Sequence, residues 1–214
     1  EGLIDRMRTS MLADKGIAIH LMSDKTVGED QYFHALNVSV LAMLLAREVG
    51  LPAEDIRQLG IGCIFHDVGK IDIPDRVLQK TEPLSRAERN LIEQHCAYGE
   101  PIGQRLGLSV KAMDILRQHH EHCDGSGYPA HLKGPQIAPL ARLVAIVNEY
   151  DNLCNQPNPA DSLSPHEALS HLFTQQRGQF DTMPLNLFIR CMGIYPPGTV
   201  VQLSDGTLGM VVSV

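Results

Sequence analysis

Two polar segments, HDVGK at residues 66–70 and HHEHCDGSGYP at residues 119–129, constrain the fold most strongly. The first puts His66 and Asp67 near the end of an apolar helical pattern, where a buried carboxylate is costly unless it is paired or coordinated to a metal ion. The second puts adjacent histidines before a glycine-rich turn, which can bring their diverging side chains together. We therefore expect the two segments to converge and form the site of a metal-dependent phosphohydrolase.

The rest of the chain indicates mainly helices. Apolar spacing and capping residues predict helices at residues 3–22, 29–49, 53–67, 85 to beyond 95, 109–120 and 140–153, with another that begins at the N-cap Ser164. In the helix at 29–49 we expect one apolar face, formed by Phe33, Leu36, Val40, Met43 and Leu44. The helix that Ser85 opens should carry His95 and break at Gly99 and Pro101. Residues 154–164, rich in Pro and Asn, are predicted to form a mobile loop.

The pattern changes after residue 195. β-branched and apolar runs at 199–203 and 208–212 flank Ser204-Asp205-Gly206, which predicts a β-hairpin. The fold class is therefore all-α with a small C-terminal hairpin. We expect three parts: an N-terminal connector helix at 1–27, a catalytic domain at 28–194 and a hairpin tail at 195–214.

Composition narrows the class of protein. The 214 residues include five cysteines, an odd number with no CxxC pair, which argues against a disulfide framework and against structural zinc and favours a reducing cytoplasm. The longest apolar run, residues 40–46, falls short of the roughly twenty residues that cross a bilayer. The net charge of −7 disfavours duplex nucleic acid as a partner, although bound cations would still attract a small anionic ligand. Because the chain begins with Glu1 and ends in a strand-like pattern, we expect a fragment whose regulatory domain is missing.

Other histidines and carboxylates complete the set of candidate ligands. Asp30 and His34 form an i, i+4 pair, which could also be a simple surface hydrogen bond, and His95 could be an ordinary helix histidine. Surface or core roles are expected for the histidines His20, His122, His131, His166 and His171. A nitrogen and oxygen ligand set without thiolate favours iron, manganese or zinc. Such cations activate water for attack on phosphorus, and Lys70 would offset negative charge on the phosphoryl oxygens.

At residues 28–203 the chain resembles the HD-GYP family of bacterial cyclic di-GMP phosphodiesterases, because HDVGK, HHExxDGxGYP and a helix histidine occur in the family's order. The resemblance implies an HD-domain helical bundle with two or three divalent cations, most often iron or manganese. It also implies hydrolysis of cyclic di-GMP to pGpG or GMP in second-messenger signalling, with GGDEF-type signalling proteins as partners. The metal ligands that it implies are Asp30 for a third cation, His34, His66, Asp67 as the bridging ligand, His95, His119 and His120.

The resemblance assigns substrate contacts as well. Lys70 matches the lysine that meets the substrate phosphate, so Asp67 and Lys70 are the candidate catalytic residues. Gly127, Tyr128 and Pro129 match the signature loop, whose tyrosine lies near the substrate.

The chain departs from the family pattern in two places. Where the family has a metal-binding Asp in a DxxDAL context, this chain reads NEYDNL, so the position is Asn148. The amide oxygen of Asn148 can coordinate a cation but brings no negative charge, so we expect one metal to bind more weakly. The family's Arg-containing stretch, which helps grip the dinucleotide, is replaced by CNQPNPAD at residues 154–161.

These departures leave alternatives open. The chain could be a degenerate member that acts as a cyclic dinucleotide receptor or protein-interaction module. It could also be another HD-type phosphohydrolase that acts on a nucleotide monophosphate or on a mixed cyclic dinucleotide. The sequence does not rank cyclic di-GMP above cyclic GMP-AMP.

Overall fold

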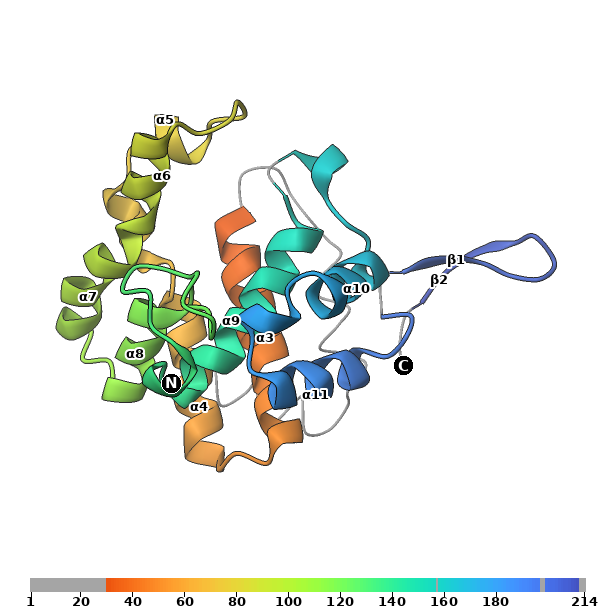
Figure 1. Cartoon of the computed structure of the whole chain (residues 1–214), viewed down its shortest axis with the longest axis horizontal. Coiled ribbons are helices and arrows are strands. Elements are labelled where there is room, and N and C mark those ends of the chain that lie inside the picture. The colour runs from red at the N-terminus through yellow and green to blue at the C-terminus, as the bar shows by residue number, and fades with distance from the viewer. Residues whose placement is uncertain (1–29, 157, 197–198, 212–214) are drawn as a thin grey trace.

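The computed structural model describes residues 30–156, 158–196 and 199–211, with the side chains of residues 30 and 31 left out. The connector helix expected within residues 1–27, including His20, lies outside this range. The described chain is helical apart from one hairpin, which confirms the predicted fold class (Figure 1). Its elements are α3 (Asp30–Val49), α4 (Ala53–Phe65), η1 (Val68–Asp72), α5 (Asp75–Leu78), α6 (Arg86–Glu93), α7 (His95–Arg105), α8 (Val110–Gln118), η2 (Gly134–Gln136), α9 (Pro139–Cys154), η3 (Pro159–Asp161), α10 (Pro165–Thr174), η4 (Arg177–Gln179), α11 (Thr182–Met192), β1 (Val200–Gln202) and β2 (Leu208–Met210).

Helix α3 is the centre of the bundle. It packs against α4, α9 and α11, while α8 contacts α4, α7 and α9. Figure 1 shows α5 to α8 on one side of α3 and α10 and α11 on the other. Residues 38–46 of α3 are buried all around the helix, so the expected single apolar face is wrong. Leu36, which was expected on this face, is 37% exposed. Ser39, a polar residue that was not expected on it, is fully buried. A helix that is apolar on every side belongs in the interior of the bundle.

The predicted helix starts are confirmed by their caps. Ser85 and Glu88 form a reciprocal capping box, in which the Ser85 backbone N–H donates to Glu88 Oε2 at 2.7 Å. Ser164 and Glu167 form a second box ahead of α10, with Pro165 at the first helical position. The Ser109 hydroxyl accepts from the backbone of Ala112 and caps α8. The segment at 154–164 is largely a loop, with the short helix η3 inside it.

The expected break at Gly99 and Pro101 is wrong. The helix that Ser85 opens ends at Glu93, and α7 begins at His95, so His95 starts a new helix and Pro101 lies inside α7. At Gly99, α7 is crossed by η1, and Gly69 of η1 lies beside it. A Cβ on Gly69 would come within 2.5 Å of the Gly99 backbone nitrogen. The glycine at position 69 lets the segment after Asp67 pack directly against the helix that carries His95.

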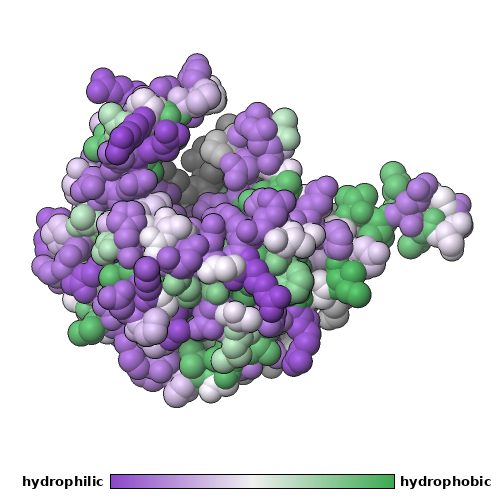
Figure 2. Space-filling model, in the orientation of Figure 1, coloured by the Kyte–Doolittle hydropathy of each residue, from purple (hydrophilic) through white to green (hydrophobic). Residues whose placement is uncertain are grey.

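The predicted hairpin is present. β1 and β2 pair antiparallel, with Val200 opposite Met210, and Gly206 in the connecting turn has a φ of +87°. The hairpin projects from the body, and Figure 2 shows hydrophobic residues gathered on it. None of the described helices combines the length and apolar character that a membrane-spanning segment needs. None of the five cysteines, all of which lie in the described part of the chain, forms a disulfide.

Candidate metal centre

His66 and Asp67 lie where α4 gives way to η1. His66 is the residue that caps the C-terminus of α4, and Asp67 immediately precedes η1. The His66 ring is fully buried, and its Nδ1–H donates to the carbonyl oxygen of Cys63 at 2.6 Å. The apolar helix thus ends by delivering an imidazole and a carboxylate into the interior of the bundle.

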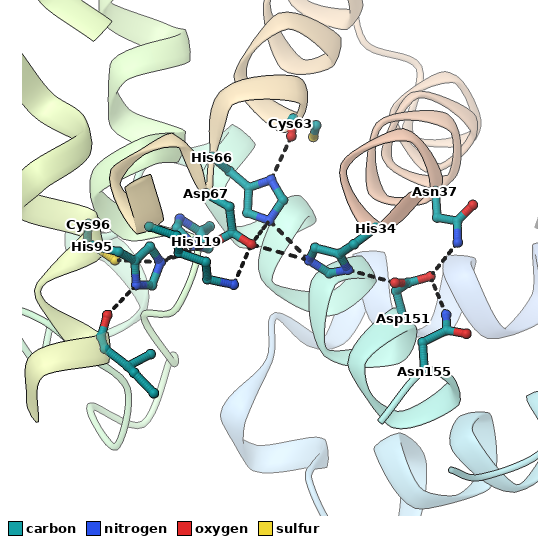
Figure 3. A network of polar contacts seen from close by, with 12 residues as sticks. His34, Asn37, Cys63, His66, Asp67, His95, Cys96, His119, Asp151 and Asn155 are labelled. Carbon is teal, nitrogen blue, oxygen red and sulfur yellow. Dashed lines mark hydrogen bonds and ion pairs between the residues drawn. The ribbon is translucent and has the colours of Figure 1, made fainter. Parts of the chain in front are cut away.

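Asp67 joins two clusters of potential metal ligands. One cluster comprises His34, His66 and Asp67, and the other comprises Asp67, His95, His119 and His120. Asp67 Oδ2 lies 3.4 Å from His66 Nε2 and 3.8 Å from His34 Nε2. Asp67 Oδ1 lies 3.2 Å from His95 Nε2 and 3.7 Å from His119 Nε2. Each carboxylate oxygen therefore faces a different cluster, as Figure 3 shows.

The hydrogen bonds at Nδ1 determine the tautomers of these histidines. His66, His95 and His119 each place Nδ1 against a backbone carbonyl three or four residues earlier in the chain, at 2.6, 2.6 and 3.0 Å. The Nδ1 of His34 lies 2.7 Å from the carboxylate of Asp151. Because these oxygens only accept, each Nδ1 must carry the proton. In the neutral rings, every Nε2 then keeps its lone pair.

These lone pairs point at one another. His34 Nε2 lies 3.2 Å from His66 Nε2, and His95 Nε2 lies 3.1 Å from His119 Nε2. Asp67 Oδ1, beside the second pair, is buried without a hydrogen-bond partner. Facing acceptors at these distances repel unless a cation lies close to them. The residues therefore fit a divalent metal centre, and their nitrogen and oxygen donors suit iron, manganese or zinc.

Burial keeps the rings of His66, His119 and His120 uncharged. It lowers the pKa of His66 and His120 well below the usual value, and it also lowers the pKa of His119, with neighbouring histidines adding to the effect. Burial by itself raises the pKa of Asp67, but the neighbouring histidines and the Lys70 ammonium lower it by more, so this pKa lies well below its usual range. A cation binds to imidazoles in the neutral form and to carboxylates in the ionised form.

Lys70 lies beside the bridging carboxylate. Its Nζ donates to Asp67 Oδ2 at 2.6 Å, and its side chain is 23% exposed. The ammonium thus reaches the centre from the solvent side. Cys96 lies close too, with Sγ 3.6 Å from His95 Nε2, but burial raises the pKa of its thiol to about 12. Cys96 is therefore a protonated thiol at neutral pH, which agrees with a ligand set free of thiolate.

The signature loop packs onto this centre. The Tyr128 ring stacks on the His120 ring, with centroids 4.5 Å apart and planes 22° from parallel. A Cβ on Gly127 would lie 2.3 Å from the backbone of both His120 and His122, so only glycine fits there. Glu121 is buried, and its carboxylate accepts from the backbone N–H of Ala130 at 2.6 Å and of Leu132 at 2.8 Å. Glu121 therefore holds in place the loop segment that follows Pro129.

We expect Glu121→Gln to destabilise the protein by about 2 kcal/mol, because one glutamine NH₂ would face a buried backbone N–H that needs an acceptor. Chemical denaturation would measure the change. The matched control is Glu82→Gln on an exposed loop, which should shift the unfolding free energy by less than about 0.5 kcal/mol. Equal stability of the two variants would contradict the anchoring role of Glu121.

The structure gathers most of the residues that the sequence singled out. The two clusters bring together His34, His66, Asp67, His95, His119 and His120. Asp30 is the first residue of α3, but its side chain lies outside the described part. Asn148 is buried on α9, and its Oδ1 has no hydrogen-bond partner. The ordinary roles expected for His122 and His166 agree with their contacts, which are to Ser126 and to the carbonyl of Ile194.

Comparison with known proteins agrees with this geometry. A family model described as the HD domain matches residues 9–183. The chain belongs to the HD domain family. Its resemblance to the HD-GYP branch is confirmed by its curated relatives. The cyclic di-GMP phosphodiesterase PA4108 of Pseudomonas aeruginosa is 32% identical over 98% of this HD-domain chain and 50% of the relative.

Other relatives carry two kinds of name. The cyclic di-GMP phosphodiesterase response regulator RpfG of Xanthomonas campestris is 35% identical over 72% of this chain and 41% of its own length. The 3′3′-cGAMP-specific phosphodiesterase 2 of Vibrio cholerae is 30% identical over 73% of this chain and 30% of its own length. The chain thus spans half or less of the length of these relatives. Among solved structures, the HDGYP protein Bd1817 of Bdellovibrio bacteriovorus shares the fold, with a TM-score of 0.71 and 22% identity over 84% of this chain and 58% of that one.

Two residues of the centre were not singled out from the sequence. Asp151 binds His34 from α9, and Glu121 binds the loop that carries Tyr128. Asp151 follows Asn148 by three residues, so helical spacing puts both on one face of α9. That spacing was the available signal, but it does not say which histidine Asp151 would meet.

Proposed function

We propose that this chain hydrolyses a phosphodiester bond of a cyclic dinucleotide, with cyclic di-GMP as the first candidate and pGpG or GMP as product. The observation that carries the proposal is the carboxylate of Asp67, which lies between two clusters of histidines whose Nε2 atoms converge. The names of the relatives support the substrate class, since they are phosphodiesterases of cyclic di-GMP or of cGAMP. In this proposal residues 28–194 form the catalytic domain and work in the cytoplasm with GGDEF-type signalling proteins.

Each residue then has a definite role. The cluster of His34, His66 and Asp67, with Asn148 as a neutral donor, would hold one cation, and the cluster of Asp67, His95, His119 and His120 would hold another. Asp30 would serve a third. When bound, such iron or manganese ions supply Lewis acidity and lower the pKa of water toward neutrality.

The chain's own groups bind and orient the substrate. The Lys70 ammonium, already at the rim of the centre, would pair with a phosphoryl oxygen and offset the negative charge that develops there. Tyr128 stacks on His120 and limits the approach to the second cluster. Gly127 and Pro129 shape the loop that holds this tyrosine in place.

Asn148 favours a second candidate function, that of a cyclic dinucleotide receptor. Among the described residues, the two clusters share one carboxylate, that of Asp67, and Asn148 contributes no charge. A centre with so little negative charge binds one cation weakly, and a weakly loaded centre could bind a dinucleotide without cleaving it.

The test compares the native chain with Asn148→Asp. We expect the native chain to bind more than one metal per chain and to hydrolyse a cyclic dinucleotide when iron or manganese is supplied. Asn148→Asp should tighten the weaker metal site by roughly tenfold or more, because it adds a negative charge to that site. Elemental analysis of protein purified without air, metal titration and chromatography of products would measure these results.

The matched control is Asn186→Asp, which makes the same chemical change at an exposed position of α11 and should leave metal binding unaltered. A substrate panel of cyclic di-GMP, cyclic GMP-AMP and nucleotide monophosphates distinguishes the candidate substrates. The enzyme proposal fails if the native chain binds less than one metal and cleaves no cyclic dinucleotide. Tight dinucleotide binding without product would favour the receptor.

A further inference from the structure

His34 is held differently from three other histidines of the centre, His66, His95 and His119. The Nδ1 groups of His66, His95 and His119 donate to carbonyls three or four residues earlier in the chain. Such local bonds form as soon as the helix end folds. His34 instead donates to Asp151, which lies on a different helix and 117 residues away in the sequence. The orientation of His34 therefore depends on the packing of α3 against α9.

Asp151 is built into this position as an acceptor of several hydrogen bonds. It is 0% exposed. Its Oδ2 accepts from His34 Nδ1 at 2.7 Å, and its Oδ1 accepts from Asn37 Nδ2 at 3.0 Å and from Asn155 Nδ2 at 2.9 Å. Figure 3 shows these three side chains converging on the carboxylate. An ionised carboxylate has no proton to donate and can accept all three bonds at once.

We propose that Asp151 is a positioning residue, which fixes the His34 ring in the tautomer and orientation that present Nε2 to the cluster of His34, His66 and Asp67. Asn37 and Asn155 hold the Asp151 carboxylate in turn. The part of the proposal that concerns metal binding rests on the proposed function, whereas the tautomer of His34 can be measured in the metal-free protein.

Charge gives Asp151 a second effect at the same cluster. Among the described residues, Asp67 is the one carboxylate in the cluster that contains His34, and the cluster that contains His95 shares it. Asn148 adds no negative charge. A buried carboxylate that accepts the Nδ1 proton of a ligating histidine makes that histidine a stronger donor at Nε2. Asp151 thus strengthens the cluster that has fewer donors, while the cluster with three histidines gains nothing from it.

A purely structural role would make different predictions. If Asp151 only joined α3 to α9, its removal would lower stability without a specific effect on the His34 ring or on one metal site. The decisive readouts are therefore the His34 tautomer and the affinities of the two metal sites taken separately.

The first measurement is nitrogen-15 NMR of the histidine rings in the metal-free native protein, with His34 assigned by comparison with His34→Gln. We expect the His34 proton on Nδ1. In Asp151→Ala, which removes the acceptor, the ring should shift toward the tautomer with the proton on Nε2. A native His34 ring protonated on Nε2 would overturn the proposal, and so would an Asp151→Ala ring with native tautomer populations.

The second measurement is calorimetric titration with Mn²⁺. Asp151→Asn keeps the shape of the side chain and removes its charge, so it should fold even where Asp151→Ala does not. We expect its weaker metal site to lose about 10- to 100-fold in affinity, with the tighter site changed less than about twofold. Asn155→Ala, which keeps the contact between Asp151 and His34, should lose less than Asp151→Asn.

Asp205→Asn makes the same chemical change in the exposed turn of the hairpin and should bind Mn²⁺ as the native protein does. Equal weakening of both sites in Asp151→Asn would overturn the proposal in favour of a structural role. A chain that hydrolyses nothing, yet shows the tautomer shift, would retain Asp151 as the positioning residue and reject the proposed function alone.

Discussion

Asp67→Asn should remove the cations from both clusters and slow hydrolysis by about a thousandfold, equivalent to about 4 kcal/mol of barrier. Asp67 contributes one oxygen to each cluster of the described residues, so its loss affects both at once. The substitution also ends the ion pair that holds Lys70 at the rim of the centre. Elemental analysis and the rate of dinucleotide cleavage would measure the two losses on the same preparation.

The fold should survive this change, because an amide is cheaper to bury than an unpaired charge. A thermal melt of the metal-free protein near the native value would show that. His171→Ala is the control, since His171 lies on α10, outside both clusters, and should keep native metal content and activity. Loss of metal and activity in both variants alike would point to misfolding, and full metal retention in Asp67→Asn would refute the bridging role.

Several helix starts, and the positions of candidate ligands at helix ends, could be predicted from the sequence because both are local properties. His66 and Asp67 end an apolar helix, and His119 follows the last residue of α8, so the amino-acid pattern alone locates them at helix termini. Ser85 and Ser164 cap helices through residues three positions later, which spacing reveals directly. Convergence of the ligands followed from the cost of burying a carboxylate without a partner.

The sequence could not predict features that depend on tertiary partners. The new helix that begins at His95 lies where η1 crosses α7. No local pattern in the sequence predicts that crossing. The burial of α3 on every side follows from its neighbours α4, α9 and α11, whose arrangement the apolar spacing does not contain. The contact of Asp151 with His34 joins residues more than a hundred positions apart. In each case the missing information is which elements pack together.

Gly69 shows the same limit. A glycine after an apolar helical run is typical of a helix stop, but Gly69 lies where η1 meets α7. A Cβ at this position would lie 2.0 Å from the carbonyl oxygen of His95 and 2.5 Å from the backbone nitrogen of Gly99. Both are backbone atoms, so no side-chain rotation relieves the overlap. We expect Gly69→Ala to destabilise the protein by about 3 kcal/mol, measured by chemical denaturation.

The effect should also be local to one metal site. η1 would have to move away from α7, which separates Asp67 from His95, so metal binding by the cluster that contains His95 should weaken more than binding by the cluster that contains His34. Gly178→Ala is the matched control, because a Cβ there meets nothing within 4 Å and should change stability by less than about 0.5 kcal/mol. If Gly69→Ala instead has the unfolding free energy and the metal affinities of the native protein, then η1 does not contact α7 closely enough to set the distance between Asp67 and His95.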